Sequence, residues 1–314
     1  MMDLVFCGTP LFAMPTLEKL VAAGFRVKLV ATQPDRPSGR GMDMAASPVK
    51  RAALALDLPI TQPEKIKNNE EFRAQLEDIA PEAIIVVGYG RIIPQWMIDL
   101  PKLGNINLHA SLLPKYRGAA PIQWAIARGE TITGVTTMRI DAGLDTGDIL
   151  LQSEECIKPE DTALTLAPRL AQTGAELMIK TLAGLKYGTV APRPQDDTQA
   201  TLAPMLRRDD GLIDFSRNAV DTWNRLRGFQ PWPGAFTSFR DKTLQLHAAT
   251  PAPERALVTP AHFAVIDDRL LLGFAHGTAL EVQDLQPEGK KLMSARDFMN
   301  GYRPRSDESL GAPE

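Results

Sequence analysis

Asn107 and His109 stand two residues apart at the end of an apolar run, and their side chains could act together on a carbonyl group. Residues two apart in a β-strand point to the same face of the sheet. When an amine attacks a carbonyl, negative charge collects on the oxygen, and a fixed donor stabilises that charge. An imidazole can also carry the proton that the amine loses. A histidine bonded to backbone carbonyls is the alternative, but His109 is the only histidine before His247, which favours acyl-transfer chemistry.

Three carboxylates, Asp141, Asp145 and Asp148, follow in a stretch that contains two glycines. An EF-hand calcium loop needs a longer ligand series that ends in glutamate, so the stretch does not match one. Two interpretations remain. The acids form a polar turn between strands, or one of them reaches His109 and fixes its tautomer. Spacing alone does not choose among the three acids.

Other catalytic motifs are missing from the sequence. The Gly8-Thr9-Pro10 turn has neither a G-x-G-x-x-G pattern nor a P-loop lysine, so we interpret it as a tight turn. There is no G-x-S-x-G elbow. The two cysteines form no disulfide framework, and Cys7 ends a buried strand with no histidine beside it in sequence. No CxxC or HxxxH spacing occurs, so we expect no metal.

The segments that must position these residues alternate between strands and helices in the first half of the chain. This pattern predicts an α/β domain with a doubly wound, mostly parallel sheet, whose ligands bind at the carboxyl ends of the strands. A long helix is expected to begin near Asp161. The other predicted segments are strands at Leu4–Phe6, Val27–Ala31, Ala83–Val87, Asn105–Leu108, Thr133–Ile140 and Ile149–Ser153, and helices at Ser47–Leu56 and Asn69–Ile79.

After Leu206 the sequence changes to short β-prone runs separated by Gly, Pro and Asp, which predicts a small C-terminal β-barrel with a helix near Asn218–Arg227. The preceding stretch has little to bury. We therefore predict a catalytic domain at 1–189, a linker or draped segment at 190–206 and the barrel at 207–314. Residues 306–314 are expected to fray.

The chain has 314 residues, of which 44% are hydrophobic and 23% charged, and its formal net charge is −3. At roughly 150 residues per domain, this length predicts two globular domains. No apolar run approaches the ~18 residues of a membrane helix, and the N-terminus lacks the basic start of a signal peptide. These features favour a cytoplasmic protein with no membrane partner. Any nucleic-acid site must rest on a local basic patch.

The motifs resemble those of the folate-dependent formyltransferases. An N-x-H-x-S-L-L-P stretch at 107–114, followed by an aspartate in the 143–148 block GLDTGD, is their shared catalytic pattern. The family's other blocks occur in order over nearly the whole length. They are Cys7–Pro10, Thr32–Gly41, Ser47–Lys50, Val87–Gly90, Pro231–Ala235 and Gln286–Ser294.

The resemblance implies a Rossmann-like formyltransferase domain followed by an OB-like barrel. It implies transfer of a formyl group from 10-formyltetrahydrofolate, a co-substrate, to the amino group of methionine on initiator tRNA, without a metal. Asn107, His109 and Asp145 match the catalytic trio. Asn107 and His109 would hold the oxyanion. Asp145 would orient His109 and, through water, help to remove the amine proton.

The resemblance also implies binding residues. Two stretches match the family's folate site, one of them along the pterin pocket: Tyr89, Gly90, Arg91 and Ile92, and Ser111, Leu112, Leu113 and Pro114. For the tRNA the family uses a loop after the second strand and a basic face of the barrel. The matching cations are Arg36, Arg40, Lys50, Lys290 and Lys291.

The sequence departs from the family in the tRNA loop. After Gly41 it has Met42-Asp43-Met44, where many relatives carry lysines, and acids offset the basic residues of the barrel, including Arg225 and Arg227. Fewer phosphate contacts predict a flatter salt dependence, and with it either weaker tRNA binding or an unusual reliance on the barrel. We also expect the loop at 39–41 to be mobile without RNA, and the protein to be a monomer.

Three alternatives remain beside this function. A hydrolase of the folate donor would replace the amine with water, but the 35–41 loop disfavours it. A second alternative is a formyltransferase that acts on sugar nucleotides. A third, from another class, is an RNA-binding protein without activity, which would not need all three members of the catalytic trio.

Overall fold

The computed structural model describes residues 2–38, 43–252 and 258–311. The chain divides into two compact units, and each unit collects more than one stretch of sequence. The first unit comprises Met1–Pro121, Ile132–Cys156 and Ala167–Ala203, and the second comprises Ile122–Thr131, Ile157–Leu166 and Pro204–Glu314. Most of the segment predicted as a linker, residues 190–203, thus belongs to the first unit.

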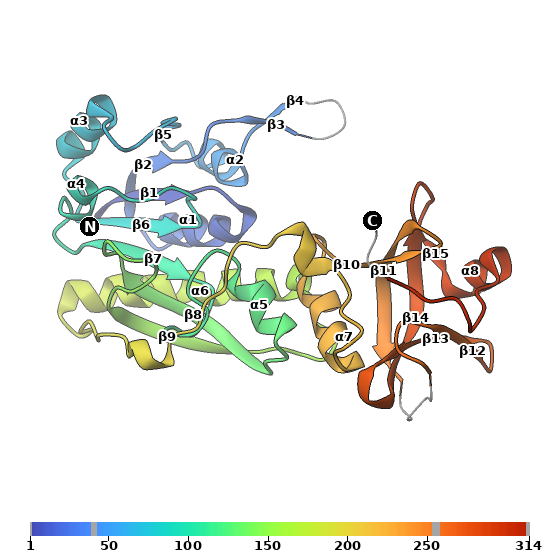
Figure 1. Ribbon diagram of the computed structural model, residues 1–314. Coiled ribbons are helices and arrows are strands. Elements are labelled where there is room, and N and C mark those ends of the chain that lie inside the picture. The colour runs from blue at the N-terminus through green and yellow to red at the C-terminus, as the bar shows by residue number, and fades with distance from the viewer. Residues whose placement is uncertain (1, 39–42, 253–257, 312–314) are drawn as a thin grey trace. The chain divides into compact units, whose positions relative to one another are not determined.

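A seven-stranded sheet, in the order β5-β2-β1-β6-β7-β8-β9, forms the centre of the first unit (Figure 1). Its strands are β1 Asp3–Gly8, β2 Arg26–Ala31, β5 Ile60–Thr61, β6 Ala83–Val87, β7 Asn105–His109, β8 Ile132–Arg139 and β9 Ile149–Cys156. Neighbours from β5 to β7 pair in parallel, whereas β8 and β9 are antiparallel. All five residues of β6 are buried, as expected of a central parallel strand. The predicted α/β fold with a mostly parallel sheet is confirmed.

Two helices in the first half of the chain, α2 and α3, have a polar N-cap residue. Ser47 Oγ accepts a hydrogen bond from the Lys50 backbone N–H, and Asn69 Oδ1 accepts one from Phe72 N–H. Such caps satisfy backbone donors that the first helical turn leaves unpaired. The helices are α1 Met14–Ala22, α2 Pro48–Ala55, α3 Glu70–Ile79, α4 Gln95–Ile98, α5 Pro121–Ala127 and α6 Ala163–Tyr187.

Two short strands absent from the prediction, β3 Arg36–Ser38 and β4 Asp43–Ala45, pair as an antiparallel hairpin (Figure 1). The hairpin lies in the stretch matched to the tRNA loop. The residues whose mobility was predicted, 39–41, lie outside the described residues.

The second unit contains an antiparallel sheet in the order β10-β11-β14-β13-β12, with β15 paired to β14 (Figure 1). Helix α7 begins at Ala219, and the carboxamide of Asn218 accepts a bond from Asp221 N–H at its start. The elements are β10 Ala235–Phe239, β11 Lys242–Pro251, β12 Phe263–Ile266, β13 Arg269–Phe274, β14 Thr278–Pro287 and β15 Met293–Ser294, with helices α7 Ala219–Gly228 and α8 Ala295–Tyr302.

The end of the described chain joins the two edges of this sheet. Backbone N–H of Ser238, in β10, donates to Gly311 O at 2.8 Å, and Leu310 N–H donates to Ala261 O, just before β12, at 2.7 Å. The Leu310 side chain is only 4% exposed. The expectation that 306–314 frays is therefore wrong for this part, while 312–314 lie outside the described residues.

An ion pair fastens the same segment to the β10–β11 turn. Arg240 donates from Nε and Nη2 to the two carboxylate oxygens of Glu308, both at 2.9 Å, and Arg305 N–H adds a third bond. Hydrogen bonding to Arg240 is the main reason why the pKa of Glu308 falls from 4.5 to about 2. A lowered pKa in the folded state means that the ionised carboxylate stabilises the fold above pH 4.5, and that this stabilisation is lost as the pH falls from 4.5 toward 2.

We predict that Glu308→Gln lowers the melting temperature at neutral pH, and that the difference from the unsubstituted protein narrows as the pH falls from 4.5 toward 2. Thermal melts followed by circular dichroism at a series of pH values measure this. Asp307→Asn is the matched control, because the Asp307 carboxylate is 74% exposed in its pairing with Arg305. A difference that does not vary with pH would contradict the prediction.

Candidate active site

The His109 ring is held at the end of β7 by a backbone carbonyl. The residue is 6% exposed, and its Nε2 lies 2.8 Å from Tyr116 O. Because a carbonyl only accepts, Nε2 carries the hydrogen, and a neutral ring then has its lone pair on Nδ1. Nδ1 lies 3.7 Å from Asp145 Oδ2, which is too long for a direct hydrogen bond but close enough for charge stabilisation. Nδ1 is therefore the ring atom left to exchange a proton.

Asp145 lies in a left-handed backbone conformation, with φ 52°, which aspartate tolerates better than most residues. Its Oδ2 accepts a hydrogen bond from Gly118 N–H at 2.8 Å. Asp141 has a different role, because its carboxylate accepts bonds from Gly143 N–H and Thr146 Oγ1 within the turn. Of the three acids that the sequence left open, the structure brings Asp145 to His109.

Asn107 shares β7 with His109, so the two side chains point to the same face of the sheet. Asn107 is partly exposed. No protein group within the described ranges bonds to its carboxamide. Its amide N–H groups are thus available to a substrate oxygen beside the imidazole.

Hydrogen bonds from β8 and β9 hold the predicted folate stretch 111–114. Thr136 Oγ1 donates to Ser111 O at 2.6 Å and accepts from Leu113 N–H, while Gln152 Nε2 donates to Leu113 O. Ser111 and Leu113 are buried, whereas Leu112 and Pro114 are partly exposed. Thr136 and Gln152, which the sequence analysis did not select, therefore fix the shape of this stretch.

The stretch at 89–92 combines buried and exposed side chains. Tyr89 is 2% exposed and packs in the core of the first unit, and burial raises its pKa. Gln33 Nε2 donates to the carbonyls of Tyr89 and Gly90, while Ile92 is 92% exposed. The Arg91 Nε atom is buried without a partner among the described residues. Burial also raises the pKa of Cys7, to about 12, which disfavours a thiolate nucleophile.

A segment distant in sequence, residues 193–203, which we call the strap, contacts the turn that carries Asp145. Gln195 Nε2 donates to Asp145 O and Gly147 O, both at 2.8 Å, and Gln195 Oε1 accepts from Arg117 Nη2 at 2.8 Å. At Gly118, a Cβ would lie 2.7 Å from the strap's Ala203 O, so the strap requires glycine there. Sequence reasoning found only a polar segment here, because no local pattern reports bonds between residues 50 apart.

The cations matched to tRNA binding differ in whether they are exposed or already paired with a carboxylate. Lys50 Nζ lies 2.5 Å from Asp35 Oδ2, and this hydrogen bond is the main cause that lowers the pKa of Asp35. Lys50 is therefore already neutralised by a protein carboxylate. Arg40 lies outside the described residues. The remaining three are exposed: Arg36, Lys290 and Lys291.

Helix α7 carries two arginines, Arg225 and Arg227, whose guanidinium groups bond to backbone carbonyls of the second unit. Arg227 is 8% exposed, donates to Asp161 O and stacks 4.0 Å from the Trp223 ring. Arg225 donates to Asp210 O, and burial lowers its pKa. These guanidinium groups stabilise the second unit, so fewer cations are available to a polyanion.

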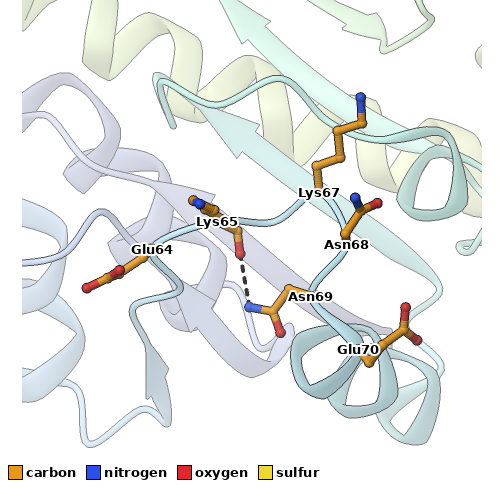
Figure 2. A pocket seen from close by; sticks show the side chains of 6 residues that line it. All are labelled: Glu64, Lys65, Lys67, Asn68, Asn69 and Glu70. Carbon is orange, nitrogen blue, oxygen red and sulfur yellow. Dashed lines mark hydrogen bonds between the residues drawn. The ribbon is translucent and has the colours of Figure 1, made fainter.

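An open hollow between β5 and α3 contains none of the predicted site residues. Figure 2 shows its polar lining, in which Asn69 Nδ2 donates to Lys65 O at 2.9 Å. The lining residues are Glu64, Lys65, Lys67, Asn68, Asn69 and Glu70. Asn69 is accounted for as the cap of α3, so we assign no activity to this hollow.

Residues 2–38, 43–252 and 258–311 contain neither a cluster of metal-ligating side chains nor a helix that could span a membrane. No group of three or more His, Cys, Asp or Glu side chains is arranged to hold a metal ion there. None of the helices in the same ranges combines the length and apolarity needed to cross a membrane.

Two family models match the chain: formyl transferase at residues 2–182 and the formyl transferase C-terminal domain at residues 205–303. The chain belongs to the formyl transferase family, as its motifs predicted. It is 66% identical over 310 residues to a methionyl-tRNA formyltransferase of Koribacter versatilis, covering 99% of each chain. A second relative of that name, from Acidobacterium capsulatum, is 61% identical over 311 residues, 99% of this chain and 100% of that one.

The fold also matches a crystal structure of an N-formyltransferase from Helicobacter canadensis in complex with folinic acid and dTDP-3-aminofucose. The TM-score is 0.67 at 21% identity, and the match covers 90% of this chain and 99% of that one. At this identity the likeness concerns the fold.

Proposed function

We propose that the protein transfers the formyl group of 10-formyltetrahydrofolate to the amino group of methionine on initiator tRNA, and so supports translation initiation in the cytoplasm. Relatives of 61–66% identity over the whole chain carry the name of this activity. The observation that carries the proposal is the His109 ring, held at Nε2 by Tyr116 O and facing Asp145 with Nδ1. We propose that the first unit performs the chemistry and that the second contributes to tRNA binding.

The geometry suggests a division of labour between two side chains. Asn107 donates to the formyl oxygen as the amine adds to the carbonyl carbon and charge collects on that oxygen. His109 accepts the amine proton at Nδ1 and returns it to the folate nitrogen as the carbon–nitrogen bond to folate breaks. Asp145 stabilises the imidazolium between these steps, at 3.7 Å. Because Nε2–H is already donated to Tyr116, we assign the oxyanion to Asn107 alone, in place of the shared role first expected.

For the folate, we propose a site along 89–92 and 111–114. The accessible side chains Ile92, Leu112 and Pro114 offer apolar contact. Tyr89 and Ser111 are buried, so they would shape the site while the backbone of Gly90, Arg91 and Leu113 lines it. Apolar walls with a few fixed polar groups are typical of cofactor sites.

One assay tests the function against its alternatives. The protein is incubated with 10-formyltetrahydrofolate and methionyl initiator tRNA, and formylmethionine and released tetrahydrofolate are measured. We expect equal amounts of both products and little release without tRNA. Release that does not need tRNA would indicate a hydrolase. Formylated product formed only with a dTDP-amino sugar would indicate a sugar formyltransferase. If no tetrahydrofolate is released under any condition, the remaining alternative is an RNA-binding protein without activity.

We predict that tRNA affinity depends weakly on salt, since Lys50 is paired with Asp35. Each phosphate contact contributes about one unit to the slope of log affinity against log salt. The variant Met44→Lys, at a residue 65% exposed on β4, is expected to steepen the slope by about one unit. Filter binding at several salt concentrations measures both slopes. The control Leu54→Lys changes a residue 62% exposed on α2. Equal steepening in both variants would contradict a contact specific to the hairpin.

A further inference from the structure

We propose that Gln195, which no motif selects, is a positioning residue that holds Asp145 in its working conformation. The proposal rests on the proposed function of the site, because it assigns Gln195 an effect on the rate of formyl transfer. The Gln195 side chain bonds to Asp145 O, Gly147 O and Arg117 and takes no part in the chemical steps proposed above. It acts through the backbone carbonyls of Asp145 and Gly147 and through Arg117.

The Gln195 carboxamide has every hydrogen-bonding position filled. Its Nε2 donates to Asp145 O and Gly147 O, both at 2.8 Å, and its Oε1 accepts from Arg117 Nη2 at 2.8 Å and Nε at 3.1 Å. An amide has two donors and two acceptor lone pairs, so four bonds exhaust it. The reversed orientation would point two N–H groups at a guanidinium, so the network fixes the orientation of the amide.

The turn that carries Asp145 needs outside support. Residues 141–144 are exposed and bury no apolar side chain, and Asp145 itself is in the left-handed region. Gln195 donates hydrogen bonds to the turn on both sides of Thr146, at the carbonyls of Asp145 and Gly147. A carboxylate that has to stabilise an imidazolium 3.7 Å away is sensitive to small displacements.

Arg117 makes the same glutamine a link between the two halves of the site. Arg117 is 7% exposed, and its Nη2 also donates to Asp197 Oδ1, in the strap, at 2.7 Å. Arg117 lies between Tyr116, whose carbonyl holds His109, and Gly118, whose N–H binds Asp145. One amide therefore joins the segment that fixes the imidazole to the turn that fixes the carboxylate.

The test is a double-substitution cycle on formyl transfer. Gln195→Met keeps the side-chain length and removes all four bonds, and we expect kcat to fall by about 10- to 100-fold with little change in either KM. In an Asp145→Ala background the same substitution is expected to lower kcat by a much smaller factor, because only the effect that runs through Arg117 remains once the carboxylate is gone. Gln199→Met is the matched control, since Gln199 lies in the strap but bonds to Asp196. An equal loss in both backgrounds, or the same loss in the control, would overturn the proposal.

A second measurement keeps the two proposals apart. Hydrogen exchange of the Gly118 amide, which binds Asp145 Oδ2, is compared between the unsubstituted protein, Gln195→Met and Gln195→Glu. The glutamate can still accept from Arg117 but cannot donate to the two carbonyls. We therefore expect the Gly118 amide to exchange faster in both Gln195 variants and at the unsubstituted rate in Gln199→Met. Unchanged exchange would refute the positioning role. An unsubstituted protein without formyl transfer would instead refute the proposed function, and the exchange would still report on Gln195.

Discussion

Asn107→Ala is expected to lower kcat by about 10²- to 10³-fold while the KM values change little. The reason is that a fixed amide donor aimed at the developing oxyanion contributes roughly 2.7–4 kcal/mol to the transition state and much less to the ground state. In the proposed mechanism no other side chain takes over this bond, because His109 Nε2–H is donated to Tyr116 O. Single-turnover formylation with saturating tRNA and folate donor measures the effect on the chemical step.

Asn105, on the same strand, provides the matched control. Its side chain is 1% exposed and donates to Met97 O at 2.8 Å and Ile98 O at 3.1 Å. Asn105→Ala removes both bonds, one buried and one partly buried, which costs about 1–3 kcal/mol of folding stability. We expect it to lower the melting temperature and to leave kcat nearly unchanged. Similar kcat losses in both variants would refute the oxyanion role of Asn107.

Asp145→Asn is expected to lower kcat by about 10²- to 10⁴-fold, the range typical of losing general acid–base assistance. The amide oxygen can still accept from Gly118 N–H, so the turn keeps its bond. The neutral amide offers no charge to the imidazolium that forms when His109 takes the amine proton. Single-turnover rates at neutral pH, together with a melting curve that shows an intact fold, measure this effect.

Asp141→Asn separates a charge in this turn from the charge beside His109. The Asp141 carboxylate accepts from Gly143 N–H and Thr146 Oγ1 and is exposed. An asparagine oxygen can accept the same bonds. We expect kcat to stay close to that of the unsubstituted protein. A loss as large as that of Asp145→Asn would mean that the turn as a whole matters and not the one carboxylate.

The sequence predicted those elements whose own residues specify them. The strand at Ala83–Val87 was found with its observed bounds, because five apolar residues in a row are typical of a strand buried on both faces. The helix predicted at Asn69–Ile79 was found as α3, Glu70–Ile79, and the structure adds that Asn69 caps it. Helix α8, Ala295–Tyr302, was missed, although Ser294 caps it by accepting from Asp297 N–H and the S-x-x-D spacing is a usable signal.

Features built from distant segments could not be predicted in this way. The 306–314 stretch has few apolar residues and suggested fraying. Leu310 is nevertheless buried, because its N–H donates to Ala261 O beside one sheet edge and Gly311 bonds to Ser238 on the other. Gln195 lies in a polar stretch of sequence, and its proposed positioning role depends on hydrogen bonds to carbonyls 48 and 50 residues away. The roles of Asn107, His109 and Asp145 remain predictions from the family pattern, to which the structure adds distances and hydrogen-bond partners.

The late position of the strap affects how the protein can be made. The ribosome synthesises Asn107, His109 and Asp145 before it reaches Gln195 and Ala203. A nascent chain that ends at residue 189 therefore contains these three side chains but lacks the strap that bonds to the Asp145 turn. Fragments cut for expression at the end of α6, at Tyr187, would share this defect. If Gln195 positions Asp145 as proposed, we expect a minimal catalytic fragment to need the residues up to Ala203, where the last stretch of the first unit ends.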